Sequence, residues 1–294
     1  MGATSSVHRA LCVLYFFIII FILMACGGGG DDSSNTPSPS PSPSAMVFFE
    51  DDFEGDPSNW ICTDGPLSKW EDNYVDPCTT SIDGFGALWK MGPGNNSSNA
   101  VYSWKKAGLT NGYRGEGRKW FTGSDVKTDI YHRWYMKVPP ASSFDKRNEE
   151  GFKFWRYLMR EDGYSNPEVI YLNAYPNSRL FSETYLTIFN SDMSVLVQLV
   201  SIESINDNAW HCFELHMTLN SNGNSNGVVE FWVDGVRTAN KTGINWGFDS
   251  QQPIAFHNID FGIGNVSDSD WFQTEWSAIG FDDIAVSTTR VGCK

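Results

Sequence analysis

The chain has 294 residues, 15% of them aromatic, and carries a formal net charge of −14 at pH 7. A length of this order holds one large all-β domain once a removable N-terminal segment is set aside. The acidic balance excludes nucleic acid as a partner, because nucleic-acid-binding proteins need a basic surface. The 12 tryptophans fit both a large core and a surface on which sugar rings stack.

Residues 1–25 have the pattern of an export signal. A weakly basic start precedes an unbroken apolar run that ends at Ala25, which is short for a membrane span but suits a signal-peptide core. Residues 23–26, LMAC, resemble the bacterial lipobox, in which Cys26 becomes the lipid-modified first residue of the mature protein. The alternative is a plain signal peptide followed by an incidental cysteine.

Residues 26–45 are a low-complexity tether of Gly, Ser and Pro. Such a segment cannot build a core, and it holds a folded domain away from a surface. The resemblance to lipoproteins implies that lipid on Cys26 anchors the domain to a bacterial cell envelope. Gly27 rather than Asp after the cysteine favours the outer membrane by analogy. The surface and periplasmic faces both stay open.

The folded domain is expected at residues 46–294, and its pattern is that of β-strands. Short alternating or apolar runs are separated by Gly, Pro, Asn and Ser, and none keeps a helical period beyond a turn or two. The runs cover residues 87–91, 131–138, 151–158, 169–173, 185–189, 195–199, 210–219, 228–233, 254–263 and 280–287. Many short strands at this spacing predict an all-β sandwich or jelly roll.

The clearest hairpin lies between residues 210 and 233. In its first strand apolar residues such as Phe213 and Leu215 alternate with polar ones, which indicates a strand with one buried face. Residues 220–227 are Asn, Ser and Gly only, which is typical of a turn. The second strand alternates again. The polar face of this hairpin displays Glu214, His216, Glu230 and Trp232.

Polar and apolar side chains also alternate in the strands at residues 131–138, 151–158 and 169–173. Strict alternation would direct Arg156 toward the core, so either a β-bulge or a partner for its charge is required there. The polar faces of these strands and of the hairpin offer Arg133, Tyr135, Lys137, Lys153, Trp155, Tyr171, Asn173, Glu214, His216 and Trp232. Aromatic rings beside cationic groups suit the binding of a carboxylated glycan.

Basic residues are concentrated in one part of the chain. Residues 105–160 contain 13 of the 21 Lys and Arg residues but only 6 of the 35 Asp and Glu residues. A basic segment inside an acidic protein is a candidate anion site. Solvated strand edges, where lysine is common, are an equally good interpretation.

Cysteine usage fits an oxidising compartment. Cys12 leaves with the signal and Cys26 would carry lipid. The four that remain, Cys62, Cys78, Cys212 and Cys293, allow three connectivities. Cys62–Cys78 is the natural local pair, which leaves Cys212–Cys293 to join the hairpin to the last strand. A metal site is the rival interpretation, but no CxxC or His-Cys spacing supports it.

Five motifs carry a resemblance to a known group. They are RWYMKVP at residues 133–139, KFWR at 153–156, WHCFE at 210–214, FWVDG at 231–235 and FDDI at 281–284. Over roughly residues 47–290 the chain resembles concanavalin A-like jelly rolls, and among them bacterial polysaccharide lyases of the heparin-, glucuronan- and alginate-lyase type. The resemblance implies a concanavalin A-like β-sandwich and β-elimination on an acidic polysaccharide.

A lyase of this class must neutralise the substrate carboxylate, remove the proton beside it and protonate the leaving oxygen. The catalytic candidates are His216 as base, Tyr135 or Tyr171 as acid, and Arg133, Lys153 or Asn173 on the carboxylate. The substrate-binding candidates are Lys137, Trp155, Asn173, Glu214 and Trp232. For each a structural role stays open: a strand histidine is more often a hydrogen-bonded structural group, and Glu214 opposite a cross-strand cation would be a simple ion pair.

We therefore expect an envelope-anchored lyase that cleaves a uronic-acid polysaccharide. One alternative is a non-catalytic carbohydrate-binding or adhesive surface domain of the same fold. A jelly-roll glycoside hydrolase is a third, although the Glu-x-Asp-x-x-Glu strand of laminarinase-like enzymes is absent from the sequence.

The expected partner is a polysaccharide, and the expected state is a monomer without a cofactor. A structural calcium ion stays open, because related jelly rolls often hold one. Asp282, Asp283 and the loop at residues 268–270 could supply oxygen ligands.

Overall fold

A computed structural model describes residues 46–56, 69–70, 72–74, 87–106, 115–140, 152–159, 169–175, 185–189, 195–221, 223–246, 255–264 and 276–294. These residues form β-strands and two single 3-10 turns, Gly123–Asp125 and Ile202–Ser204, and they include no α-helix. The all-β prediction is confirmed. No helix that could cross a membrane occurs in these ranges.

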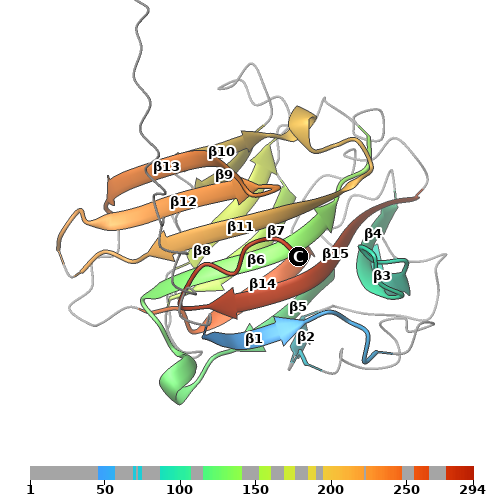
Figure 1. Cartoon of the computed structure of the whole chain (residues 1–294), viewed down its shortest axis with the longest axis horizontal. Coiled ribbons are helices and arrows are strands. Elements are labelled where there is room, and N and C mark those ends of the chain that lie inside the picture. Colours follow the sequence, from blue (N-terminus) through green and yellow to red (C-terminus); the bar gives the residue numbers. More distant parts are fainter. Residues whose placement is uncertain are drawn as a thin grey trace, which may run out of the picture. The chain divides into compact units, whose positions relative to one another are not determined.

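The first sheet, sheet A, holds eight of the described strands, and all its neighbouring strands are antiparallel (Figure 1). Its order is β13 (Val236–Ile244), β12 (Gly227–Val233), β11 (Trp210–Thr218), β6 (Asp129–Lys137), β15 (Trp276–Ser287), β4 (Ala100–Lys106) and β3 (Ala87–Gly92). β1 (Val47–Asp51) pairs with the second half of β15, beyond the part that pairs with β4.

The second sheet, sheet B, holds seven described strands and is also antiparallel. Its order is β10 (Val195–Ser201), β9 (Tyr185–Phe189), β8 (Val169–Tyr175), β7 (Phe152–Leu158), β14 (Asn258–Gly264), β5 (Gly115–Trp120) and β2 (Asp72–Tyr74). In Figure 1 its strands lie behind those of sheet A.

The core lies between the two sheets and is built from the alternating apolar residues of both. Trp134 of β6 lies 5.2 Å from Trp155 of β7, and Phe281 of β15 lies 5.4 Å from Phe261 of β14, measured between ring centroids. The hairpin alternation is confirmed, since Phe213 and the other apolar positions of β11 are buried there. The fold is therefore a two-layer β-sandwich, in which each sheet has one core face and one outer face.

The irregular strand predicted around Arg156 is β7, and it does contain a β-bulge, between Lys153 and Trp155 in the pairing with β8. The bulge reverses the expected parity after Lys153. Trp155 and Tyr157 point into the core with 1% and 0% exposure, and Arg156 takes an outward position. The prediction that Trp155 lies on a displayed face is wrong, because the extra residue shifts every later side chain to the opposite face.

Five short or irregular strands were not predicted: β1, β2, β4, β5 and β13. β13 shows why, because its residues are exposed on both faces except for the half-buried Ala239 and the buried Ile244, so it lacks an apolar alternation. The predicted runs all correspond to strands, with ends that differ by a few residues.

Candidate functional site

The sequence-predicted site residues lie in two different sheets. Arg133, Tyr135, Lys137, Glu214, His216 and Trp232 belong to β6, β11 and β12 of sheet A. Lys153, Tyr171 and Asn173 belong to β7 and β8 of sheet B, where Lys153 pairs with Asn173. Positions 171 and 173 alternate with the core residues Ile170 and Leu172. The polar strand faces that the sequence offers therefore belong to two different sheets.

On sheet A the C-terminal segment, residues 288–294, crosses the outer face from the end of β15 (Figure 1). The buried carboxylate of Glu214 anchors it. One Glu214 oxygen accepts hydrogen bonds from the backbone N–H groups of Val291 (2.7 Å) and Gly292 (3.0 Å), and the other accepts one from Arg290 Nε (2.8 Å). Glu214 thus holds the protein's own chain.

Three more predicted site residues contact the same segment. Arg133, which is 3% exposed, donates from Nη1 to the carbonyl of Gly292 at 3.4 Å. The hydroxyl of Tyr135 accepts a hydrogen bond from the backbone N–H of Lys294 at 2.8 Å. The guanidinium of Arg290 lies 4.5 Å from the ring centroid of Trp232. These side chains therefore hold the C-terminal segment against the outer face of sheet A.

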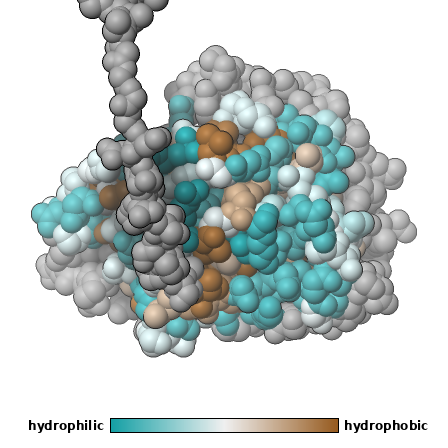
Figure 2. Space-filling model, in the orientation of Figure 1, coloured by the Kyte–Doolittle hydropathy of each residue, from teal (hydrophilic) through white to brown (hydrophobic). Residues whose placement is uncertain are grey.

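A disulfide between Cys212 and Cys293 completes this attachment, as predicted, across a sequence separation of 81. The expected pair Cys62–Cys78 and the lipidation candidate Cys26 lie outside the described residues. In Figure 2 the visible part of this face is mostly hydrophilic, with hydrophobic groups between.

His216 lies on the same outer face between two carboxylates. Its Nδ1 is 3.0 Å from Glu230 Oε2, its Nε2 is 2.9 Å from Asp129 Oδ1, and its ring stacks on Tyr131 at 4.1 Å. Burial lowers the pKa of His216, but the hydrogen bonds and charges of both carboxylates outweigh it and raise the net pKa. Both ring nitrogens of His216 therefore face carboxylates of the same chain, which leaves neither nitrogen directed at a substrate proton.

Two further histidines have structural partners. His132 is fully buried between Trp134 and Trp155, and burial, together with the nearby charge of Arg133, lowers its pKa to about 3. His211 lies between Asp234 (2.7 Å) and Asp207 (3.1 Å). His132 is buried away from solvent, and both ring nitrogens of His211 face carboxylates of the same chain.

On sheet B a row of charged residues crosses three neighbouring strands. Asp260 of β14, 2% exposed, lies between its register partners Arg118 of β5 and Arg156 of β7. Arg118 Nε donates to Asp260 Oδ1 at 3.0 Å, and Arg156 donates to Oδ2. Arg156 is in turn the register partner of Tyr171. A buried carboxylate in this position fixes the orientation of two guanidinium groups.

Sequence reasoning missed Arg118 and Asp260 as site residues. Two signals pointed toward this row: the inward parity of Arg156, and the basic segment at residues 105–160, which supplies both arginines. The partner Asp260 lies 104 residues beyond Arg156, in a strand read only as an apolar run. No local pattern could have joined them.

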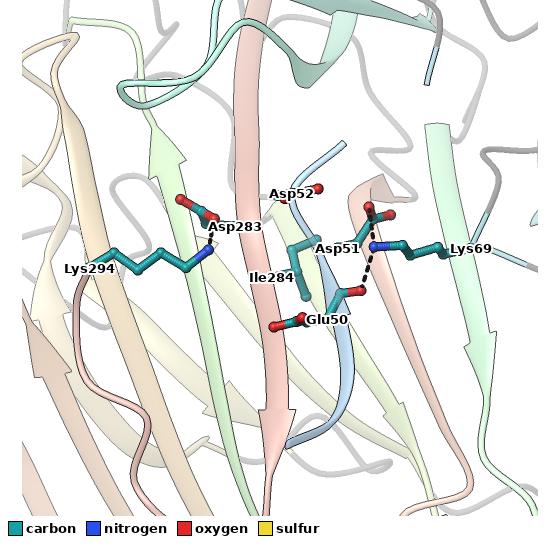
Figure 3. Close-up of a pocket in the computed structure, with 7 residues that line it drawn as sticks. All are labelled: Glu50, Asp51, Asp52, Lys69, Asp283, Ile284 and Lys294. Atoms are coloured by element: carbon teal, nitrogen blue, oxygen red, sulfur yellow. Dashed lines mark hydrogen bonds and ion pairs between the residues drawn. The ribbon is translucent and has the colours of Figure 1, made fainter. Parts of the chain in front are cut away.

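A small pocket of about 50 Å³ lies between β1 and β15 (Figure 3). Lys69 pairs with Asp51 there, and Lys294 pairs with Asp283. A cavity needs about 10–15 Å³ of such volume to hold one water, so this pocket has room for only a few waters. The pocket is therefore a small gap bounded by two ion pairs.

No group of three or more His, Cys, Asp or Glu side chains suited to a metal ion occurs among the described residues. The carboxylate of Asp282 accepts hydrogen bonds from the backbone N–H of Asn95 and from Ser97 Oγ. The loop at residues 268–270 lies outside the described ranges. The calcium interpretation stays an untested prediction.

Comparison with known proteins gives matches by structure only. No family model matches the sequence, and no curated protein matches it. An endo-β-1,4-glucuronan lyase from the fungus Trichoderma reesei has a TM-score of 0.53 and 14% identity, over 83% of this chain and 96% of the lyase.

Two alginate lyases are also similar. One, solved as a mutant in complex with an alginate tetrasaccharide, has a TM-score of 0.49 and 12% identity over 69% of this chain and 88% of that one. The other, from Aplysia kurodai, has a TM-score of 0.46 and 12% identity over 68% and 87%. On the glucuronan lyase match, this chain has the β-sandwich jelly-roll fold of a known polysaccharide lyase.

Proposed function

We propose that this protein is a polysaccharide lyase that cleaves a uronate-containing polysaccharide by β-elimination, and that its site lies on the outer face of sheet B. The observation that carries the site assignment is the row Arg118–Asp260–Arg156. The fold shared with a glucuronan lyase supports the reaction class.

The row suits the first requirement of the reaction, which is to neutralise a substrate carboxylate. Asp260 holds both guanidinium groups in place before substrate arrives, and Asp72 of β2 is the next register partner beyond Arg118. Fixed donors of this kind stabilise the negative charge that develops when the proton beside the carboxylate is removed. Lys153 and Asn173, paired in the neighbouring strands, can extend the same binding surface.

Tyr171 is the proposed proton-transfer residue, because it is the register partner of Arg156. A tyrosine in its phenolate form can take the proton beside the carboxylate. The neutral phenol formed in that step can return a proton to the leaving oxygen. His216 and Tyr135, the other sequence candidates, lie on sheet A beside the C-terminal segment and the two carboxylates described above.

The two faces make opposite predictions in one assay. The full chain is incubated with alginate, glucuronan, heparin and pectate, and the ultraviolet absorbance of unsaturated sugar ends is followed. Arg156→Ala and Tyr171→Phe should each lower kcat/KM by about 10²–10⁴-fold. His216→Ala and Tyr135→Phe should keep the wild-type rate.

Loss of activity in His216→Ala with retention in Tyr171→Phe would move the site to sheet A. If no polysaccharide gives absorbance although the protein binds one of them in an affinity gel, the non-catalytic binding domain is the better account.

We also propose that the protein is exported and lipid-anchored through Cys26. The support is the sequence LMAC at residues 23–26 and the tether that follows. Labelled palmitate should be incorporated by the wild type but not by Cys26→Ser, and the variant should leave the membrane fraction. Equal labelling of both proteins would contradict the anchor.

A further inference from the structure

A second row of residues crosses sheet A beyond the C-terminal segment. Trp210 of β11, Lys137 of β6, Gly280 of β15 and Tyr102 of β4 are successive register partners. Directly opposite residues of antiparallel strands point to the same face, so all of them lie on the outer face. The C-terminal segment ends at Lys294 on the hydroxyl of Tyr135, two residues before Lys137 along β6.

Two glycines let the aromatic rings of this row lie close to the backbone. A Cβ atom on Gly280 would come within 2.7 Å of Trp210 Cη2 and within 3.0 Å of Tyr102 Cε1. A Cβ atom on Gly92 would come within 2.7 Å of Tyr102 Cε2. Side chains at these two positions would therefore displace the rings.

The two rings form a corner. Their centroids are 6.0 Å apart and their planes meet at 67°. The Tyr102 hydroxyl donates to the carbonyl of Pro93 at 2.7 Å, which fixes its ring. Burial, together with the charge of Asp282, raises the pKa of Tyr102 to about 12, so the ring stays a neutral phenol. Both rings are half-buried, and each keeps part of its surface in solvent.

We propose that Trp210 and Tyr102 form a second carbohydrate site, which binds a pyranose ring of an acidic polysaccharide while Lys137 pairs with the sugar carboxylate. The apolar face of a pyranose packs on an aromatic ring. Because the two ring planes meet at an angle, one ring can contact the face of the sugar and the other can contact its edge. Lys137 is half-buried in the same row and forms no ion pair with any described residue. Its charge complements a uronate.

This site would hold the polymer without cleaving it. It lies on the outer face of sheet A, and the Arg118–Asp260–Arg156 row lies across the core on sheet B. Binding at one site raises the effective concentration of the same chain at another when the polymer is long enough to reach both. That the bound polymer is also the substrate of the lyase rests on the proposed function. The binding site itself does not depend on it.

The test is affinity electrophoresis of the full chain in gels that contain glucuronan or alginate. Trp210→Ala and Lys137→Gln should each weaken binding by about fivefold to tenfold, and Trp210→Phe should restore most of it. Lys241→Gln changes an exposed lysine of β13 in the same sheet and serves as the matched control. The rate on short oligosaccharides should be unchanged in all four variants, because these substrates cannot reach both sites.

The proposal is overturned if Trp210→Ala and Lys137→Gln bind as tightly as the wild type, or if Lys241→Gln weakens binding equally. If Trp210→Ala misfolds, its rate on short oligosaccharides will fall as well. The binding of Trp210→Phe and Lys137→Gln then tests the proposal in its place. If no variant produces unsaturated ends but binding still depends on Trp210 and Lys137, the lyase proposal fails and this site stands.

Discussion

The two outer faces of the sandwich use similar side chains in different ways. On sheet A two polar residues of β11 are matched to groups of the same chain: Glu214 to Arg290, and His216 to two carboxylates. On sheet B one carboxylate, Asp260, serves two guanidinium groups. A polar strand face is therefore a site candidate only after the partners supplied by the rest of the chain are known.

The largest stability effect should come from the attachment of the C-terminal segment to sheet A. Replacing both cysteines, Cys212→Ser with Cys293→Ser, should cost about 4 kcal/mol, because the disulfide closes a long loop in the unfolded chain. Denaturant unfolding measures this cost. Limited trypsin digestion should then cut after Arg290, which the wild type resists.

The same double variant sharpens the comparison between the faces. If sheet A has only a structural role near its C-terminal segment, the rate on short oligosaccharides is kept under conditions where the variant stays folded. A lost rate in the folded variant would mean that this face contributes to the reaction.

A somewhat smaller effect is expected on sheet B from Asp260→Asn. The change leaves two guanidinium groups without their shared carboxylate and should destabilise the fold by about 3 kcal/mol while lowering lyase activity. Asp283→Asn is the matched control on sheet A. Its partner is the half-exposed Lys294, and its φ of 48° suits asparagine.

Asp283→Asn should cost less than 1 kcal/mol, because solvent around the half-exposed Lys294 screens this ion pair, and it should leave activity unchanged. Equal losses of stability and activity in Asp260→Asn and Asp283→Asn would remove the distinction between the two faces.

The sequence predicts some features of this fold and not others, because each sequence pattern carries a limited kind of structural information. Period-two alternation identifies which residues of a strand share a face, so the core positions of β6, β11 and β12 could be predicted. It does not say which of the two sheets a strand joins. β6 pairs with β11 and β15, which lie far along the chain, so the separation of Arg133 from Lys153 was not readable.

The errors at single residues have equally specific causes. The predicted outward position of Trp155 is wrong because the β-bulge lies between Lys153 and Trp155 and not at Arg156. The partners of Glu214, which are Arg290 and two backbone N–H groups, could not be predicted, because they lie in a segment with no regular structure. The Cys212–Cys293 pair, by contrast, is predicted once the two nearby cysteines, Cys62 and Cys78, are paired with each other.

The smallest predicted effect is the pH dependence that the histidine of sheet A imposes. The pKa of His216 is raised above its ordinary value of 6.5 because Asp129 and Glu230 outweigh the opposing effect of burial. The folded state therefore binds a proton more tightly than the unfolded state. The stability from this group is complete below pH 6.5 and is lost as the pH rises through the raised pKa.

Urea unfolding of the wild type should accordingly show a free energy of unfolding that falls by about 0.5–1 kcal/mol per such histidine above pH 6.5, since partly exposed carboxylates are screened. His211, whose pKa is also raised, contributes in the same direction. His216→Gln should remove its share of this slope, and lyase activity should keep the same pH profile because Tyr171, not His216, is the proposed proton-transfer residue. If the pH profile of lyase activity shifts in His216→Gln, a residue of sheet A takes part in the reaction.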